Sequence, residues 1–232
     1  MNQKLLSIIT VVFNEENNIE KTIESVIAHL TSECEYIIID GGSTDGTIEI
    51  VGNYTDFINE FISEPDSGIY DAMNKGIARA SGKWLYFINA GDQLLNIPAE
   101  ILLTSNNDQL LSFPVFINKK KRLLPNFNSF ILIKNTLPHQ GCFYLNDGFV
   151  KYNLDYPIFS DYHLNLRYYQ SKKIVKCFKS PIVASHSTNG VSNSKKSIGE
   201  FYSLVHKENG FFWFLLSFIY FKLRGVRYRL FK

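Results

Sequence analysis

Acidic residues end two apolar runs of the chain, with Asp40 after Tyr36–Ile39 and Asp92 shortly after Trp84–Ile88. Short apolar runs that stop at turns are typical of buried strands. In open α/β sheets, ligands bind beyond the carboxyl ends of the strands, which is where these acids would lie. A carboxylate there can hold a hard divalent cation that takes its other ligands from water and a diphosphate. Asp92 is therefore a candidate metal ligand.

The turn after Asp40, Gly41–Thr47, is rich in glycine and hydroxyl side chains. It matches neither the P-loop pattern nor the GxGxxG fingerprint, which argues against kinase-like and dinucleotide-dependent chemistry. Asp40 can accept hydrogen bonds from a ribose hydroxyl or a nucleobase imide. The alternative is that Asp40 and Asp45 only shape the turn.

The elements that position these acids alternate between strand and helix. We expect strands over 5–13, 36–39, 57–63 and 84–88, and helices after the first three of them, the third over 67–80. Asn14 is a candidate N-cap of the first helix, and Ile48 and Val51 are expected to point inward in the second. Alternation with short connections predicts a mostly parallel sheet, which brings Asp40, the 64–68 loop and Asp92 to one edge.

The bulk composition narrows the class of protein. A chain of 232 residues can bury one good core, so we expect one domain over 1–205 and an appended tail over 206–232. A net charge of +2 gives no reason to expect a nucleic-acid partner. Cys34, Cys142 and Cys177 are isolated in sequence, which is typical of reduced cysteines in a cytoplasmic protein. The first apolar run is too short for a signal peptide and is better explained as a strand.

Three segments together resemble the family 2 glycosyltransferases: ITVVFNEENNIEKTIESV, EYIIIDGGSTDGT and EPDSGIYDAMNKGIARASGKWLYFINAGD. The resemblance is dense over residues 5–95 and closest to bacterial members that build exopolysaccharide, capsule or O-antigen units. It implies a glycosyltransferase A-type fold, an α/β domain with a mostly parallel, Rossmann-like sheet flanked by helices. It also implies metal-dependent, inverting transfer of a hexosyl-type sugar from a nucleotide diphosphate sugar, with UDP favoured, to a growing, lipid-linked glycan.

The resemblance also implies roles for individual residues. The residues implied to hold the nucleobase and ribose are Val12, Phe13, Asn14 and Asp40. Asp92 matches the last carboxylate of the family's DxD-type motif, which ligates Mn²⁺ or Mg²⁺ on the diphosphate. The common Asp-x-Asp-Asp is here Asn89-Ala90-Gly91-Asp92, so Asn89 can bind a sugar or ribose hydroxyl but adds no charge. Asp66 and Asp71 are further candidate donor contacts, with a helix-cap or surface role as the alternative.

The catalytic base implied by the resemblance is Asp161, which opens an expected helix at Phe159–Leu166. Inverting transfer needs one carboxylate to take the proton of the acceptor hydroxyl. A helix N-terminus favours the ionised carboxylate, which suits a base. The alternative is that Asp161 only caps the helix, and Asp155 is the second candidate for the base.

Two histidines are further candidates. His139 resembles a residue near the acceptor side of these enzymes, although a buried structural histidine is the alternative. His186, in a segment that resembles a closing loop, is a candidate further metal ligand or an ordinary loop residue. In the rest of the second half we expect a helix from Pro98, strands over 110–117, 119–124 and 174–184, and a solvated basic turn at 119–122.

The segment Gly210–Lys232 combines an apolar run, Phe211–Phe221, with several cations. The run is about half of the ~20 residues that a membrane-spanning helix needs. We expect an amphipathic helix on an anionic cytoplasmic leaflet, which would place the protein at the inner face of the cell membrane. The alternatives are a helix packed on the domain and a homodimer contact.

The rival function is a non-catalytic sugar-nucleotide-binding or scaffold protein of a polysaccharide assembly complex. A third possibility, a nucleotidyltransferase, would need a basic, glycine-rich N-terminal loop that this sequence lacks.

Overall fold

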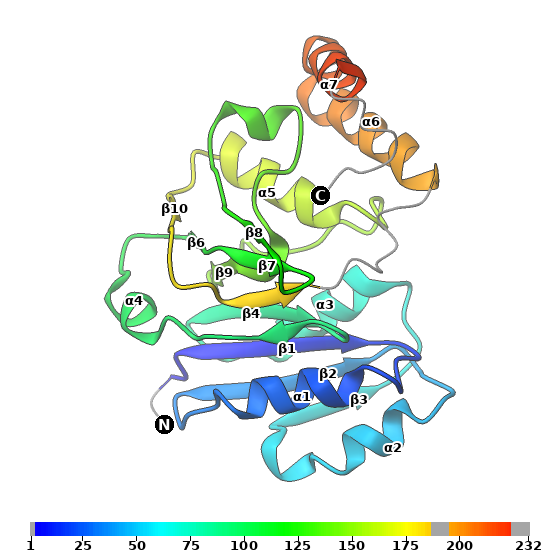
Figure 1. The fold of residues 1–232 in the computed structure, drawn as a ribbon, viewed down its shortest axis with the longest axis vertical. Helices are drawn as coiled ribbons and strands as arrows, with labels where there is room; N and C mark the ends of the chain where they lie inside the picture. The colour runs from blue at the N-terminus through cyan, green and yellow to red at the C-terminus, as the bar shows by residue number, and fades with distance from the viewer. Residues whose placement is uncertain (1–2, 187–194, 224–232) are drawn as a thin grey trace.

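A computed structural model describes residues 3–186 and 195–223 of the chain (Figure 1). The main sheet has seven strands in the order β10-β6-β9-β4-β1-β2-β3, and a smaller sheet has four in the order β5-β11-β7-β8. In the main sheet only β9 runs antiparallel to its neighbours, β4 and β6. The predicted α/β domain with a mostly parallel sheet is confirmed.

The strands are β1 (Leu6–Val12), β2 (Cys34–Asp40), β3 (Glu60–Ser63), β4 (Trp84–Asn89), β5 (Gln93–Leu94), β6 (Leu110–Ser112), β7 (Val115–Ile117), β8 (Lys121–Leu123), β9 (Cys142–Leu145), β10 (Val175–Cys177) and β11 (Ala184–His186). The helices are α1 (Ile19–Ile27), α2 (Thr47–Gly52), α3 (Ile69–Arg79), α4 (Ala99–Thr104), α5 (Ser160–Gln170), α6 (Lys195–Asn209) and α7 (Phe211–Leu223), and short 3₁₀ turns lie at Thr55–Phe57, Ser129–Leu132 and His139–Gly141.

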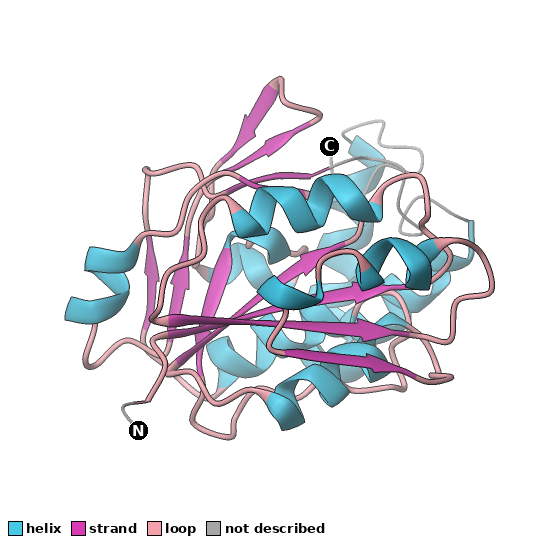
Figure 2. Cartoon of the chain, turned by 90° about the horizontal axis from the view of Figure 1, so that it is seen from below, coloured by secondary structure: helices cyan, strands magenta, loops and turns pink. Residues whose placement is uncertain are grey.

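Helices cover both faces of the main sheet (Figure 2). Successive side chains of a strand point to opposite faces, so a strand with two apolar faces is buried on both. In β4, Trp84, Tyr86 and Ile88 join the core under α1, α2 and α4, whereas Leu85 and Phe87 join the core under α3 and α5. A third apolar cluster joins α5, α6 and α7.

The carboxyl ends of β1 to β4 lie at one edge of the sheet. The register pairs Val12 with Asp40, Asp40 with Ser63, and Val11 with Asn89. The turn that carries Asp92 follows β4 directly. The prediction that Asp40, the 64–68 loop and Asp92 share one edge is therefore confirmed.

Three local expectations for the first half were wrong. Helix α1 begins at Ile19 after Asn18, and Asn14 instead has a left-handed backbone (φ 50°) and accepts a hydrogen bond from the backbone N–H of Thr44. Ile48 is exposed because α2 buries Thr47 and Val51. The expected strand over 57–63 begins only at Glu60, because a 3₁₀ turn precedes it.

The second half differs more. The expected strand over 110–117 is two strands, β6 and β7, which belong to different sheets. β8 pairs antiparallel with β7, so Lys121 and Arg122 lie in a strand beyond the turn, and they are exposed as expected for a solvated hairpin. The closing loop expected after His186 lies outside the described residues.

The C-terminal helices pack on the domain. Helix α6 runs through the expected boundary between residues 205 and 206, so that boundary stays a prediction. Ser217 of α7 donates a hydrogen bond to the carbonyl of Ile133 (2.7 Å). Among residues 3–186 and 195–223, no helix has the length and apolar content to cross a membrane.

Candidate active site

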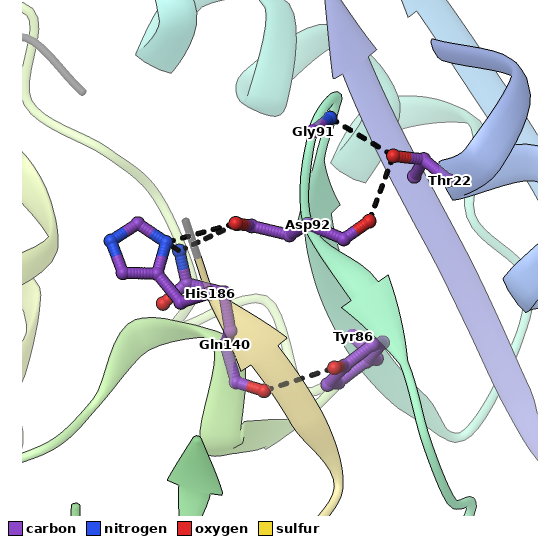
Figure 3. A network of polar contacts seen from close by, with 6 residues as sticks. All are labelled: Thr22, Tyr86, Gly91, Asp92, Gln140 and His186. Atoms are coloured by element: carbon purple, nitrogen blue, oxygen red, sulfur yellow. Dashed lines mark hydrogen bonds and ion pairs between the residues drawn. The ribbon is translucent and has the colours of Figure 1, made fainter. Parts of the chain in front are cut away.

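Asp92 lies in the turn after β4 and is held by contacts from three other parts of the chain (Figure 3). Thr22 of α1 donates to the carbonyl of Asp92 (2.8 Å) and accepts from the N–H of Gly91 (2.9 Å), whose φ of 93° suits a glycine. The Asp92 carboxylate is buried. Its Oδ2 accepts from Gln140 Nε2 (2.9 Å), and its Oδ1 lies 2.9 Å from His186 Nδ1.

The predicted metal ligands Asp92 and His186 are therefore neighbours. His186 comes from β11, which pairs with β5 directly after the Asp92 turn. No group of three or more His, Cys, Asp or Glu side chains suited to an ion occurs among the described residues. One carboxylate and one imidazole fit an ion that takes its other ligands from a diphosphate and water. The pair does not fit a closed structural metal site, which needs more protein ligands.

Asn89, at the end of β4, has a buried Oδ1 with no hydrogen-bond partner among the described residues. Buried polar atoms are normally paired, so an unpaired one at a cavity wall marks a place for a ligand donor. The binding of a hydroxyl group by Asn89 stays a prediction.

A cavity of about 620 Å³ lies beside this turn. Its lining contains Asn89, His139, Gln140, Asp161 and His186. Asp92 lies behind Gln140 and His186 and is not itself part of the lining. Four of the residues predicted from different parts of the chain thus meet at one cavity.

Asp161 lies in the first turn of α5, and its carboxylate is held by side chains from two other segments. Tyr70 Oη donates to Oδ1 (3.0 Å) and Asn135 Nδ2 to Oδ2 (3.1 Å). Tyr70 Oη also lies 2.9 Å from the carbonyl of Ile158, and its single proton can serve only one acceptor at a time. Asn135 is oriented by Asn165, whose Nδ2 donates to Asn135 Oδ1 (3.1 Å).

Burial raises the pKa of Asp161 to about 6, and hydrogen bonds from Tyr70, Asn135 and backbone N–H groups offset only part of that effect. The helix N-terminus favours the ionised form of Asp161, as expected, but burial has the larger effect and raises the pKa. The alternative, that Asp161 only caps the helix, does not hold, since Phe159 occupies the N-cap position and the Asp161 carboxylate accepts hydrogen bonds from Tyr70 and Asn135. A carboxylate with a pKa near 6 is a stronger base than an ordinary one and is still ionised at neutral pH.

His139 has the buried, hydrogen-bonded position that the structural alternative held, and its contact with an acceptor stays a prediction. It is buried, its Nε2 lies 2.8 Å from Tyr152 Oη, and it also lines the cavity. Burial lowers the pKa of His139 to about 4, so the ring is neutral. Asp155, the second candidate for the base, is exposed and does not line the cavity.

The predicted nucleotide residues lie at the same sheet edge but outside the cavity lining. Asp40 is fully buried and accepts from the N–H groups of Gly42 (3.1 Å) and Ser43 (3.0 Å) and from Ser63 Oγ (2.6 Å). Asp40 thus shapes its turn, as one alternative held, and its contact with a nucleotide stays a prediction.

Around that turn, Phe13 is 58% exposed, and Val12 is buried and accepts from the N–H of Gly41 through its carbonyl. Asp66 lies over Gly41, where a Cβ would meet Asp66 Oδ2 at 2.5 Å. Asp71 accepts from the N–H of Ser67 (3.0 Å) at the start of α3, which agrees with the helix-cap alternative.

Sequence reasoning missed the residues that hold the acids: Thr22, Tyr70, Asn135 and Gln140. None of them is charged. Thr22, Tyr70 and Gln140 are each separated from the acid they contact by 48 or more residues in sequence, and Asn135 is separated from Asp161 by 26. The one available signal was the adjacency of Gln140 to His139.

Comparison with known proteins gives the family. Residues 7–97 match the model of Glycosyl transferase family 2. An uncharacterized glycosyltransferase of Mycobacterium tuberculosis is 31% identical over 177 residues, which cover 70% of this chain and 68% of the relative. The chain belongs to glycosyltransferase family 2.

Solved structures support the fold of this family 2 glycosyltransferase. S. aureus TarS 1–349 in complex with UDP-GlcNAc has a TM-score of 0.70 and 17% identity, covering 88% of this chain. The chain spans 66% of that TarS fragment. Glucosyl-3-phosphoglycerate synthase from Mycobacterium tuberculosis, in complex with Mn²⁺, UDP and glucosyl-3-phosphoglycerate, has a TM-score of 0.59 and 17% identity, covering 87% of this chain and 80% of that one. At these identities the likeness concerns the fold alone.

Proposed function

We propose that the protein transfers a sugar from a nucleotide diphosphate sugar, with UDP as the favoured nucleotide, to a hydroxyl group of a growing glycan with inversion at C1. The observation that carries the proposal is the meeting of Asp161, Asn89 and His186 at one cavity, with Asp92 directly behind. UDP-GlcNAc in the TarS fragment and UDP with Mn²⁺ in the glucosyl-3-phosphoglycerate synthase support the choice of donor.

In the proposed reaction the acceptor oxygen attacks C1 of the donor sugar and its proton passes to Asp161. The bond between C1 and the phosphate oxygen breaks, and its electron pair leaves with the diphosphate. Asp92 and His186 would hold Mn²⁺ or Mg²⁺, which when bound stabilises the charge of the leaving diphosphate. Asn89 would bind a hydroxyl of the donor, and Tyr70 and Asn135 keep the Asp161 carboxylate directed at the cavity.

The nucleoside would lie at the neighbouring strand ends. Phe13 and Asn14 present exposed groups there, and Asp40, Asp66 and Asp71 hold the surrounding turns. His139 would contact the acceptor as a neutral ring. We further propose that the acceptor is a lipid-linked unit of an exopolysaccharide, capsule or O-antigen, used at the cytoplasmic face of the cell membrane by a domain over 1–205 with a tail over 206–232.

Asp161→Asn tests the base directly. We expect the transfer rate to fall by a factor on the order of 10²–10⁴, the share a general base supplies, while UDP binding is retained. Asp155→Asn is the matched control because Asp155 is exposed and outside the cavity lining. Full transfer activity in Asp161→Asn would refute the assignment.

Donor hydrolysis by the purified protein separates an enzyme from the rival scaffold function. An enzyme should slowly hydrolyse a UDP-sugar in a reaction that Asp92→Ala abolishes. A protein that binds UDP-sugars but neither hydrolyses nor transfers them would be a binding or scaffold protein.

A further inference from the structure

Helix α7 is apolar on two opposite faces. Its inner face, which includes the buried Ser217 and Phe221, packs in the cluster shared with α5 and α6. Its outer face presents large apolar side chains that are between 42% and 81% exposed: Phe211, Phe212, Leu215, Phe218, Ile219 and Leu223. These positions recur at helical spacing and form one stripe. A helix that is apolar all round is ordinarily buried, so the outer face needs a partner.

The same helix forms a wall of the active-site cavity. Tyr220 is part of the cavity lining, as are Phe130 and Lys134. The ring centroids of Tyr220 and Phe130 are 6.2 Å apart, and Lys134 Nζ lies 5.5 Å from the centroid of Tyr220. The Tyr220 end of the cavity is thus bordered by aromatic rings and one cation.

A short segment connects α7 to the candidate base. Ser217 binds the carbonyl of Ile133, and Asn209 Nδ2 binds the carbonyl of Leu132 (2.8 Å). Two residues further on, Asn135 donates to Asp161. The cavity therefore extends from the base to the helix that carries the exposed stripe. Its apolar lining includes Ile69, Met73, Ile117, Leu124, Pro157 and Phe159.

Length and charge decide what covers the stripe. The 13 residues of α7 extend only about 20 Å, short of the ~30 Å of a bilayer core. The sequence from Lys222 to Lys232 holds five cations and no acidic residue. An apolar stripe beside such a basic sequence complements the surface of an anionic bilayer better than it complements a second, equally basic copy of the chain.

We propose that the outer face of α7 lies in an anionic lipid surface, and that the Tyr220 end of the cavity receives the hydrocarbon part of an acceptor embedded in that surface. The first part stands on the exposed stripe, the length of α7 and the basic sequence beside it, and does not depend on the proposed function. The second part rests on the proposed transferase function and specifies its acceptor: a sugar hydroxyl reaches Asp161 while an apolar chain lies against Tyr220 and Phe130.

Vesicle flotation with the full chain tests the lipid surface. We expect binding to vesicles of phosphatidylcholine mixed with phosphatidylglycerol, and weaker binding to phosphatidylcholine alone. Phe212→Glu/Phe218→Glu should weaken that binding by about tenfold or more, because it places two charges in the apolar stripe. Donor hydrolysis should not change, since neither residue lines the cavity.

The matched control is Phe57→Glu/Leu103→Glu, which changes two apolar residues, each 50% exposed, outside α7 and outside the cavity lining. Leu103 belongs to α4, which lies far from α7 (Figure 1). This variant should bind vesicles like the wild type. An equal loss of vesicle binding in both variants would overturn the proposal. So would a wild-type dimer that does not bind vesicles and becomes a monomer in Phe212→Glu/Phe218→Glu.

Calorimetric titration with a dodecyl glycoside, below its micelle concentration, tests the acceptor end without requiring transfer. The wild type should bind it at least about tenfold more tightly than the methyl glycoside of the same sugar, since burying two methylene groups already gives that factor. Tyr220→Ala should lose most of this preference. Equal affinity for the two glycosides would overturn the second part. If the preference is present but donor hydrolysis and transfer are not, the proposed function fails and the apolar subsite stands.

Discussion

At the scale of single residues, the pKa of Asp161 predicts how transfer depends on pH. A base must be unprotonated, and a pKa of about 6 means that the carboxylate loses its proton as the pH rises through 6. The single-turnover transfer rate should therefore rise over the range around pH 6 and level off above pH 7. An ordinary aspartate would have reached that level below pH 5. A rate independent of pH between 5 and 7 would contradict the role of Asp161.

Asn135 should influence the pH at which the transfer rate rises. Its amide donates to the ionised form of Asp161. Asn135→Ala should therefore raise the pKa of Asp161 further and shift the rising part of the pH–rate curve to higher pH by about one unit. The plateau rate at high pH should fall less than in Asp161→Asn, which distinguishes a positioning residue from the base itself. Asn126→Ala is the control. Asn126 lines the same cavity, whereas the side chains that donate to Asp161 are Tyr70 and Asn135. An unshifted pH–rate curve in Asn135→Ala would exclude the positioning role.

At the scale of elements, α1 holds the turn that carries Asp92. Thr22→Val keeps the side-chain volume but removes the hydroxyl that bonds the N–H of Gly91 and the carbonyl of Asp92. Leaving these buried groups unpaired should lower the free energy of unfolding by about 1–3 kcal/mol and weaken the binding of UDP with Mn²⁺. Denaturant unfolding and calorimetry measure the two effects.

Thr104→Val is the matched control, because Thr104 is exposed and its hydroxyl donates only to carbonyls of its own helix among the described contacts. Its free energy of unfolding should change by less than about 0.5 kcal/mol. If the two variants behave alike, the hydroxyl of Thr22 does not hold the turn.

The elements of the first half could be predicted because their signals are local. Each buried strand is a short apolar run, each run ends at a turn, and parallel neighbours bring those ends to one edge, as with Asp40 and Asn89. The second half could not be predicted in this way. β9 lies between β4 and β6 and pairs Trp84 with Leu145, a partner that no periodicity specifies. The same holds for Tyr70 and Asp161, which meet only because α3 and α5 cover the same face of the sheet.

At the scale of the whole molecule, the candidate metal site is incomplete without the nucleotide. Asp92 comes from the main-sheet edge and His186 from the smaller sheet, and together they supply only a carboxylate and an imidazole. An ion and a nucleotide diphosphate that complete each other's coordination must each raise the affinity for the other by the same factor. We therefore expect Mn²⁺ alone or UDP alone to raise the melting temperature little.

The two ligands together should raise it by more than the sum of their separate effects. At a ligand concentration of about 100 times Kd, binding stabilises the fold by about 2.7 kcal/mol, which for a chain of this size is about 5–11 °C. Asp92→Ala should retain the response to UDP and lose the extra response to Mn²⁺. Additive shifts in the wild type would mean that ion and nucleotide do not share a site, and the pairing of Asp92 with His186 would then need another explanation.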